Sequence, residues 1–184
     1  TATIAPDAGS ERMRRVVNKG ITEDHVVAAA ETLVAADIPN LKVYFMIGLP
    51  TETETDVAAI VDLVKQIKHR FLRTSRGKGH IGDITVSLSS FVPKPFTPFQ
   101  WAAMDEVKTL KTKIKMVKTG LKKTANVRVH ADVPRWAYHQ GVIARGQRRL
   151  GDKLLLSHKN KAKMPQTFKE TQKNPHNKVQ RERN

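Results

Sequence analysis

Residues 41–50 read LKVYFMIGLP, a run of apolar and aromatic side chains almost without polar relief. Only Lys42 interrupts the run before Gly48. Continuous apolar runs of this length are typical of parallel strands that are covered on both faces. Gly48-Leu49-Pro50 ends the run sharply, because proline fixes the bend of the chain. We therefore predict a buried parallel strand over Leu41–Ile47.

Similar patterns lie on both sides of this strand. Further strands are expected over residues 2–5, 84–88 and 126–131, and helices over residues 10–18, from Thr22, from Thr55 or Asp56, over 107–121 and over 134–150. Strands that recur about every 40 residues with helices between them indicate right-handed β-α units and a parallel sheet. The predicted fold class is α/β: a partial (β/α) barrel of about three consecutive parallel β-α units, with a C-terminal helical extension and a basic tail.

Three regions are expected on this basis. Residues 1–104 form the barrel part, residues 105–156 form a helical and strand extension packed on it, and residues 157–184 form a basic, disordered tail. Four strands and their helices need no more than one ordinary domain, which the length of 184 residues allows.

The chain is strongly basic, with a formal net charge of +16. Positive charge concentrates between Lys108 and Lys123 and again after Ser157. Such charge favours RNA, DNA or anionic surfaces through counterion release. A solvated helix face and a disordered tail explain the same charge. No apolar stretch is long enough to span a membrane and no signal peptide is visible, so a cytoplasmic protein is expected.

The sequence contains no cysteine. Disulfides, thiolate nucleophiles and an iron–sulfur cluster held by this chain are therefore excluded. The seven histidines have no spacing typical of a metal site. We expect neither a metal-ligating nor a catalytic residue within these 184 residues.

Three loops follow the predicted strands, where parallel α/β folds bind their ligands. Asp7 opens the first loop and can accept hydrogen bonds from a ribose diol, or can simply form a turn. Gly48–Glu52 opens the second, where glycine allows a ligand close to the backbone or serves an ordinary turn. Phe91–Phe99 holds three prolines and three phenylalanines, which suit a pocket wall or packing across the barrel end equally well.

Four motifs occur in a fixed order along these loops. They are APDAGSER at 5–12, NKGIT at 18–22, YFMIGLPTET at 44–53 and SSFVPKP at 89–95. Together they resemble the second half of the radical S-adenosylmethionine (SAM) barrel, and most of all the radical SAM proteins that carry an upstream cobalamin-binding-type domain. RWAY at 135–138 and ARGQRRL at 144–150 are similar to that subgroup, so the resemblance covers roughly residues 1–155.

The resemblance implies S-adenosylmethionine as a cofactor and assigns residues to it. Asp7 would bind the ribose and Lys19, twelve positions on, the carboxylate, with Ser10 in the same loop. The residues expected near adenine are Ile47, Gly48, Pro50, Val92 and Pro93. The family also uses a 4Fe–4S cluster to cleave SAM reductively, and cobalamin is a further cofactor of the resembling subgroup.

The cluster motif CxxxCxxC and the first half of the barrel precede these motifs in the family, and neither is present here. We therefore expect part of an enzyme that is inert alone, with the missing N-terminal half of the barrel as its partner and an unknown substrate. The alternative is a non-catalytic basic module that binds RNA or another nucleic acid. A phosphate-binding barrel is weaker still, because no glycine-rich phosphate loop is present.

Overall fold

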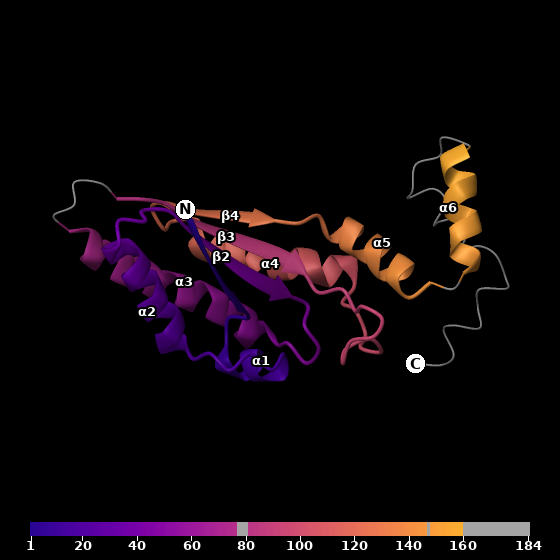
Figure 1. Ribbon diagram of the computed structural model, residues 1–184, viewed down its shortest axis with the longest axis horizontal. Coiled ribbons are helices and arrows are strands. Elements are labelled where there is room, and N and C mark those ends of the chain that lie inside the picture. The colour runs from indigo at the N-terminus through magenta and orange to yellow at the C-terminus, as the bar shows by residue number, and fades with distance from the viewer. Residues whose placement is uncertain (77–80, 147, 160–184) are drawn as a thin grey trace. The chain divides into compact units, whose positions relative to one another are not determined.

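The computed structural model describes residues 1–76, 81–146 and 148–159 and shows alternating strands and helices (Figure 1). In chain order the elements are β1 (Ala2–Asp7), α1 (Glu11–Val16), α2 (Glu23–Ala35), β2 (Leu41–Ile47), α3 (Glu54–Ser75), β3 (Ile84–Ser90), α4 (Val107–Leu121), β4 (Val127–Ala131), α5 (Pro134–Ala144) and α6 (Arg149–Lys159). The predicted strand over Leu41–Ile47 is confirmed with the same bounds.

The four strands form one parallel sheet in the order β1-β2-β3-β4, so each strand pairs with its neighbour in the chain. Leu41 lies opposite Ala2 on one side and opposite Ile84 on the other, and Ile84 in turn lies opposite Val127. This is the topology of consecutive β-α units, and the predicted α/β class with a partial barrel is confirmed. β4 adds a fourth strand to the same sheet.

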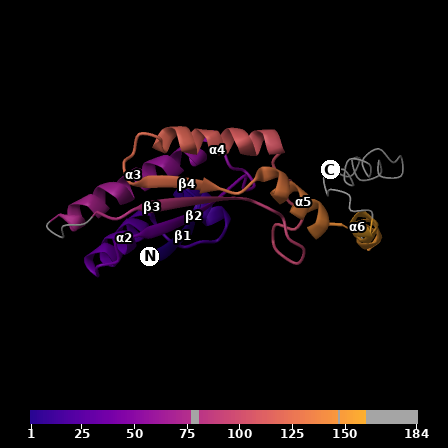
Figure 2. The same cartoon turned by 90° about the horizontal axis from the view of Figure 1, so that it is seen from above.

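Helices α2, α3 and α4 connect successive strands and share one apolar core with the sheet. Figure 2 shows α3 and α4 along one side of the strands. Alternate residues of β2 point into this core, and all four of them are at most 1% exposed: Leu41, Val43, Phe45 and Ile47. Period-two burial against amphipathic helices is what holds a β-α unit together.

The prediction that β2 is covered on both faces is wrong for the part of the chain that the structure describes. Lys42, Tyr44 and Met46 point away from the helices and are only half-buried. Their neighbours on this face of β3 are the polar residues Thr85, Ser87 and Ser89. The ammonium group of Lys42 lies 4.7 Å from the centroid of the Tyr44 ring. A lysine that packs its aliphatic stem on the strand and keeps its charge near solvent is typical of a surface that is only partly covered.

Several boundaries differ from those expected. α3 begins after Thr53, whose hydroxyl accepts from the Asp56 amide, and not at Thr55 or Asp56. The helix expected over 134–150 stops at Ala144, and a second helix continues to Lys159, past the predicted start of the tail. The rest of that tail, residues 160–184, lies outside the described residues.

The chain divides into two compact units, Thr1–Gly141 and Val142–Asn184. The first holds the whole sheet, so α4 and β4 lie in the same unit as β1–β3. The boundaries predicted at residues 104 and 156 stay predictions. Among the described residues, no helix combines the length and apolar character that crossing a membrane requires.

Candidate cofactor site

The loops after β1, β2 and β3 meet at one edge of the sheet. Because the strands are parallel and in register, their carboxyl ends lie side by side. A small apolar cluster joins the loops and is separate from the main core. We call it the rim cluster: Ala8, Met13, Leu49 and Phe91, each at most 7% exposed. The predicted convergence of the three loops at one rim is therefore present.

Asp7 and Lys19 form an ion pair at this rim. Lys19 Nζ lies 2.5 Å from Asp7 Oδ2, and the two side chains are 33% and 28% exposed. Asp7 has φ +65°, in the left-handed region, and the β1–β2 register shifts between Ile4 and Asp7. Strained backbone and register irregularities recur beside functional sites. The structure thus brings together the two charged residues assigned to the cofactor.

A fully buried arginine, which the sequence analysis did not single out, shapes the first loop. Arg14 Nη1 donates to the carbonyl oxygens of Ala8 and Gly9 at 3.0 and 2.9 Å, and its Nε donates to that of Ile21. Burial lowers the pKa of this guanidinium. Three carbonyl contacts from one rigid, planar group hold the backbone that follows Asp7.

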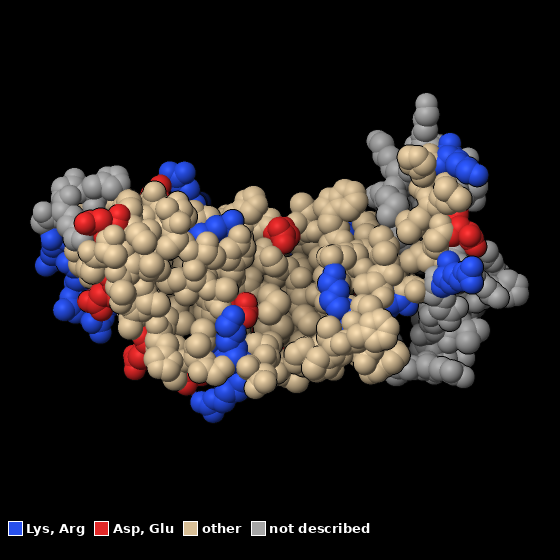
Figure 3. Space-filling view, in the orientation of Figure 1, with Lys and Arg blue, Asp and Glu red and all other residues tan. Residues whose placement is uncertain are grey.

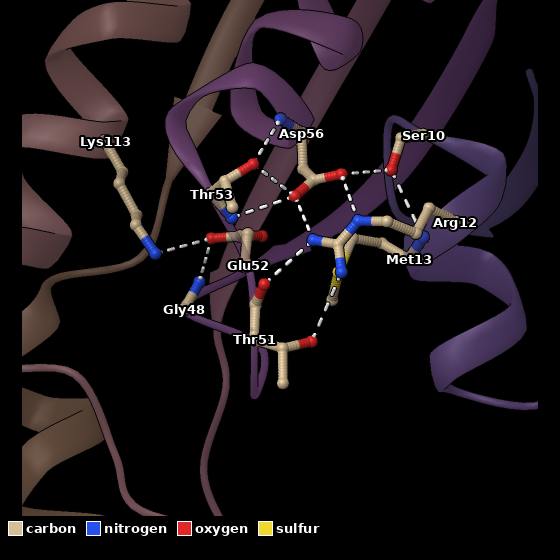
Figure 4. A network of polar contacts seen from close by, with 9 residues as sticks. All are labelled: Ser10, Arg12, Met13, Gly48, Thr51, Glu52, Thr53, Asp56 and Lys113. Carbon is tan, nitrogen blue, oxygen red and sulfur yellow. Dashed lines mark hydrogen bonds and ion pairs between the residues drawn. The ribbon is translucent and has the colours of Figure 1, made fainter.

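A network around Asp56 connects the first loop to the second (Figure 4). Ser10 Oγ donates to Asp56 Oδ1 at 2.6 Å, and Arg12 binds the same carboxylate and also the Thr51 carbonyl oxygen at 2.8 Å. The Thr53 amide donates to Asp56 Oδ2 at 2.8 Å. Burial alone would raise the pKa of Asp56, but the hydrogen bonds from Arg12, Ser10 and Thr53 lower it well below its usual range.

A second buried network supports the loop after β2. Lys113 Nζ lies 2.8 Å from Glu52 Oε2 and 2.7 Å from Asp105 Oδ2, and the Gly48 amide donates to Glu52 Oε2 at 2.7 Å. Burial raises the pKa of Glu52, although Lys113 and the amide favour its charged form. For Lys113 burial acts to lower the pKa, but the two carboxylates outweigh it and raise the pKa. The ion pair fixes the backbone turn at Gly48.

Gly48 is needed for packing within the chain. It has φ +77°, and a Cβ there would lie 2.6 Å from Leu110 Cδ2 and 3.2 Å from Asp105 Oδ2. Leu110 of α4 and Asp105, which precedes α4, therefore occupy the space beside the Gly48 Cα atom, so a ligand cannot approach the backbone from that side. Contact between a ligand and the remaining backbone of this turn stays a prediction.

The other residues expected near adenine lie along the same edge. The Ile47 side chain is buried in the main core, and its carbonyl oxygen accepts from the Phe91 amide at 2.8 Å. Pro50 and Val92 are half-buried, and Pro93 is buried. Val92 lies beside α5, since its Cγ1 is 3.8 Å from where a Cβ of Gly141 would be.

A pocket of about 560 Å³ opens at the carboxyl ends of β3 and β4. Its lining residues are Ser90, His130, Ala131, Asp132, Val133, Trp136, Ala137 and Gln140. Ser90 Oγ is buried and has no hydrogen-bond partner in the described part of the chain. The sequence analysis did not predict this pocket, because it placed the strand over 126–131 in the extension and not in the barrel part. The sequence did indicate two of the elements that line the pocket, a strand and a helix that starts at Pro134. Within the described ranges, no group of three or more His, Cys, Asp or Glu could hold a metal ion.

Comparisons with known proteins give a family match that includes two of the three rim loops. Residues 1–64 match the model of the Radical SAM superfamily; they contain β1, β2, Asp7, Lys19 and the Gly48–Glu52 turn. The chain is also 33% identical over 150 residues to an uncharacterized protein of Methanocaldococcus jannaschii, a match that covers 82% of this chain and 31% of that protein.

A second relative is the tRNA-2-methylthio-N(6)-dimethylallyladenosine synthase of Desulforamulus reducens. It is 34% identical over 68 residues, which are 36% of this chain and 15% of the synthase. The chain thus spans less than a third of the length of either relative. No solved structure gives a significant match.

Proposed function

We propose that this chain is the cofactor-binding part of a radical SAM enzyme and that its rim binds the adenosyl and methionyl groups of S-adenosylmethionine. The observation that carries the proposal is the meeting of three loops around the rim cluster, two of them within the segment that matches the superfamily. In the complete enzyme, bound SAM would supply the radical chemistry that acts on a substrate.

The residues at the rim fit this cofactor chemically. SAM carries a vicinal diol, a carboxylate and a flat base. Asp7 offers a hydrogen-bond acceptor for the diol, and Lys19 offers a positive charge for the carboxylate. In the structure these two side chains neutralise each other, so the ligand would insert its own polar groups between them. Ser90, two residues before Val92, offers a buried hydroxyl that lacks a partner among the described residues.

The iron–sulfur cluster does not fit this chain, because the sequence has no cysteine. We therefore assign the cluster ligands, and the rest of the barrel, to protein outside these 184 residues. The half-buried polar face of β2 and β3 would then be closed by the other strands of the barrel. The greater length of both relatives supports this division. Use of cobalamin stays a proposal, supported only by the motifs of the resembling subgroup.

We further propose RNA as the substrate class. The support is the name of one relative, a synthase that makes a modified tRNA nucleoside, together with the net charge of +16. Polyanions bind such a surface with release of counterions.

Titration of SAM into the isotope-labelled 184-residue chain, followed by amide NMR shifts, tests the cofactor role. We expect saturable shifts at Asp7, Gly48 and Val92 together. Asp7→Asn should weaken binding by about tenfold, because a charge-assisted hydrogen bond is lost. Asp62→Asn, on the exposed face of α3, is the matched control and should leave binding unchanged. Saturable binding without shifts in these loops, or no binding, would reject the proposal.

A further inference from the structure

The outer face of α4 carries a straight row of lysines. Lys108, Lys111, Lys115, Lys118 and Lys122 follow one another at intervals of three and four residues, and all five are exposed. We call this row the lysine stripe. Residues at this spacing lie on one side of an α-helix, and fourteen steps of helical rise make the stripe about 21 Å long.

Beyond Asp105 and Glu106, which precede its first turn, the stripe has no acidic neighbour within α4. α4 contains no Asp or Glu within Val107–Leu121, and none of the five lysines forms an ion pair with another described residue. Like charges three or four residues apart on a helix repel one another and lower the stability of that helix. Because the lysines repel one another in the free protein, binding of an anion to this face of α4 would relieve the repulsion.

Positive charge is not spread evenly over the three helices that connect the strands. α2 has three acidic residues and no Lys or Arg, whereas α3 mixes both signs and pairs Arg70 with Glu31. On the face shown in Figure 3, uncharged side chains predominate and the charged residues are scattered. Among these three helices, α4 therefore has the largest basic surplus, because it carries lysines without any Asp or Glu between Val107 and Leu121.

The direction of α4 relates the stripe to the candidate cofactor site. α4 starts at Val107, after the loop that follows β3, and leads to β4, which begins beside Ile84 at the start of β3. Lys108 is therefore nearest the rim, and Lys122 lies toward the opposite edge of the sheet. An extended ligand along the stripe would end at the rim.

The composition of the stripe favours a nucleic acid over a protein partner. Protein interfaces are depleted in lysine and depend on buried aromatic or apolar anchors. Among the described residues of α4, Met116 is the one large apolar side chain that is exposed, at 36%. Lysine is instead the ordinary contact to phosphate oxygens.

We propose that the lysine stripe binds the phosphate backbone of RNA and leads it toward the rim. The choice of RNA rests on the substrate class proposed above, whereas the stripe itself rests on the geometry of α4. The contact is with phosphates and not with base edges, so it sets the position of the RNA and leaves sequence selection to other residues.

The test is fluorescence anisotropy of a labelled RNA hairpin with the 184-residue chain at several KCl concentrations, without cofactor. The variant K111Q/K115Q/K118Q removes three charges from the stripe. Its control, K65Q/R73Q/R76Q, removes three exposed charges from α3 and its C-terminal cap. We expect the stripe variant to bind RNA about tenfold or more weakly and to lose roughly three units of salt slope. The control should change affinity less than about twofold.

Equal losses in the two variants, or no loss in the stripe variant, would overturn the proposal. So would equally tight binding of a DNA duplex of the same sequence, or equal competition by polyglutamate. Circular dichroism checks that both variants keep their helices. The RNA-binding assay contains no SAM, so a negative result in it would not bear on the SAM titration. A negative SAM titration would likewise not bear on the RNA-binding result.

Discussion

Glu52 and Lys113 form a buried ion pair, 2.8 Å between Oε2 and Nζ, although 61 residues separate them in the sequence. Their side chains are only 2% and 10% exposed. Glu52 belongs to the turn after β2, and Lys113 belongs to α4. The pair thus connects the candidate cofactor loop to the helix that carries the lysine stripe, from the opposite side of that helix.

Replacement of Lys113 should expose how much the turn depends on this pair. Lys113→Met leaves the Glu52 carboxylate buried without its partner, and we expect a loss of about 3–5 kcal/mol in the free energy of unfolding. Urea denaturation measures it. The double variant E52Q/K113M removes both charges and should lose less than K113M alone. A double variant as unstable as K113M would contradict this account.

Asp56 should make stability depend on pH on the acid side. Its lowered pKa means that its contribution is present above the unfolded-state pKa of about 3.9 and is lost as pH falls through the lower folded-state value. The gap in unfolding free energy between the natural protein and Asp56→Asn should therefore be largest near neutral pH and shrink below about pH 4. Urea melts at several pH values measure the gap. Asp62→Asn controls for loss of a carboxylate, and a gap that stays constant down to pH 2 would refute the assignment.

Gly48→Ala should destabilise the protein by about 2–4 kcal/mol, since alanine is strained at a positive φ and its Cβ would collide with Leu110. Gly20 offers a matched control, because a Cβ at that position would meet no atom within 4 Å. Gly20→Ala should change stability by less than about 1 kcal/mol. Thermal denaturation compares the two, and equal effects would show that crowding at Gly48 is unimportant.

Phe91→Ala removes the largest member of the rim cluster and its edge-to-face contact with Phe99, whose ring centroid is 5.9 Å away. We expect a loss of about 3–5 kcal/mol and faster hydrogen exchange in the loops after β1 and β2. Phe96, at 97% exposure, is the control, and Phe96→Ala should cost less than about 0.5 kcal/mol. Unchanged amide hydrogen exchange in the loops after β1 and β2 would mean that Phe91 does not stabilise those two loops.

Much of the fold was predictable because its signals are local. The run Leu41–Ile47 predicted β2 with its observed bounds, and the helix expected from Thr22 is α2, for which Thr22 is the N-cap. The start of α3 was missed although its signal was present: Thr53 and Asp56 have the spacing of a capping box. The half-open face of β2 was missed because an apolar run does not show what lies on each side of a strand.

The candidate site was predictable in position but not in its internal contacts. Parallel topology alone puts Asp7, Gly48 and Val92 at one edge of the sheet. Asp56 also binds Ser10 and Arg12, 46 and 44 residues away, and Glu52 binds Lys113, 61 residues away. No local pattern predicts these distant partners. The pocket beside Ser90 likewise requires β4 to join the sheet.

The separation of the rim cluster from the main core has a consequence for detecting a ligand. Small clusters open at a lower free energy than the whole domain, so the loops around Ala8, Leu49 and Phe91 form a unit that can fluctuate by itself. Any compound that binds only the closed arrangement raises the cost of that opening by mass action. Binding of a compound at the rim would therefore slow amide hydrogen exchange in all three loops at once, although they are some forty residues apart in the sequence. This would hold for any compound that binds there.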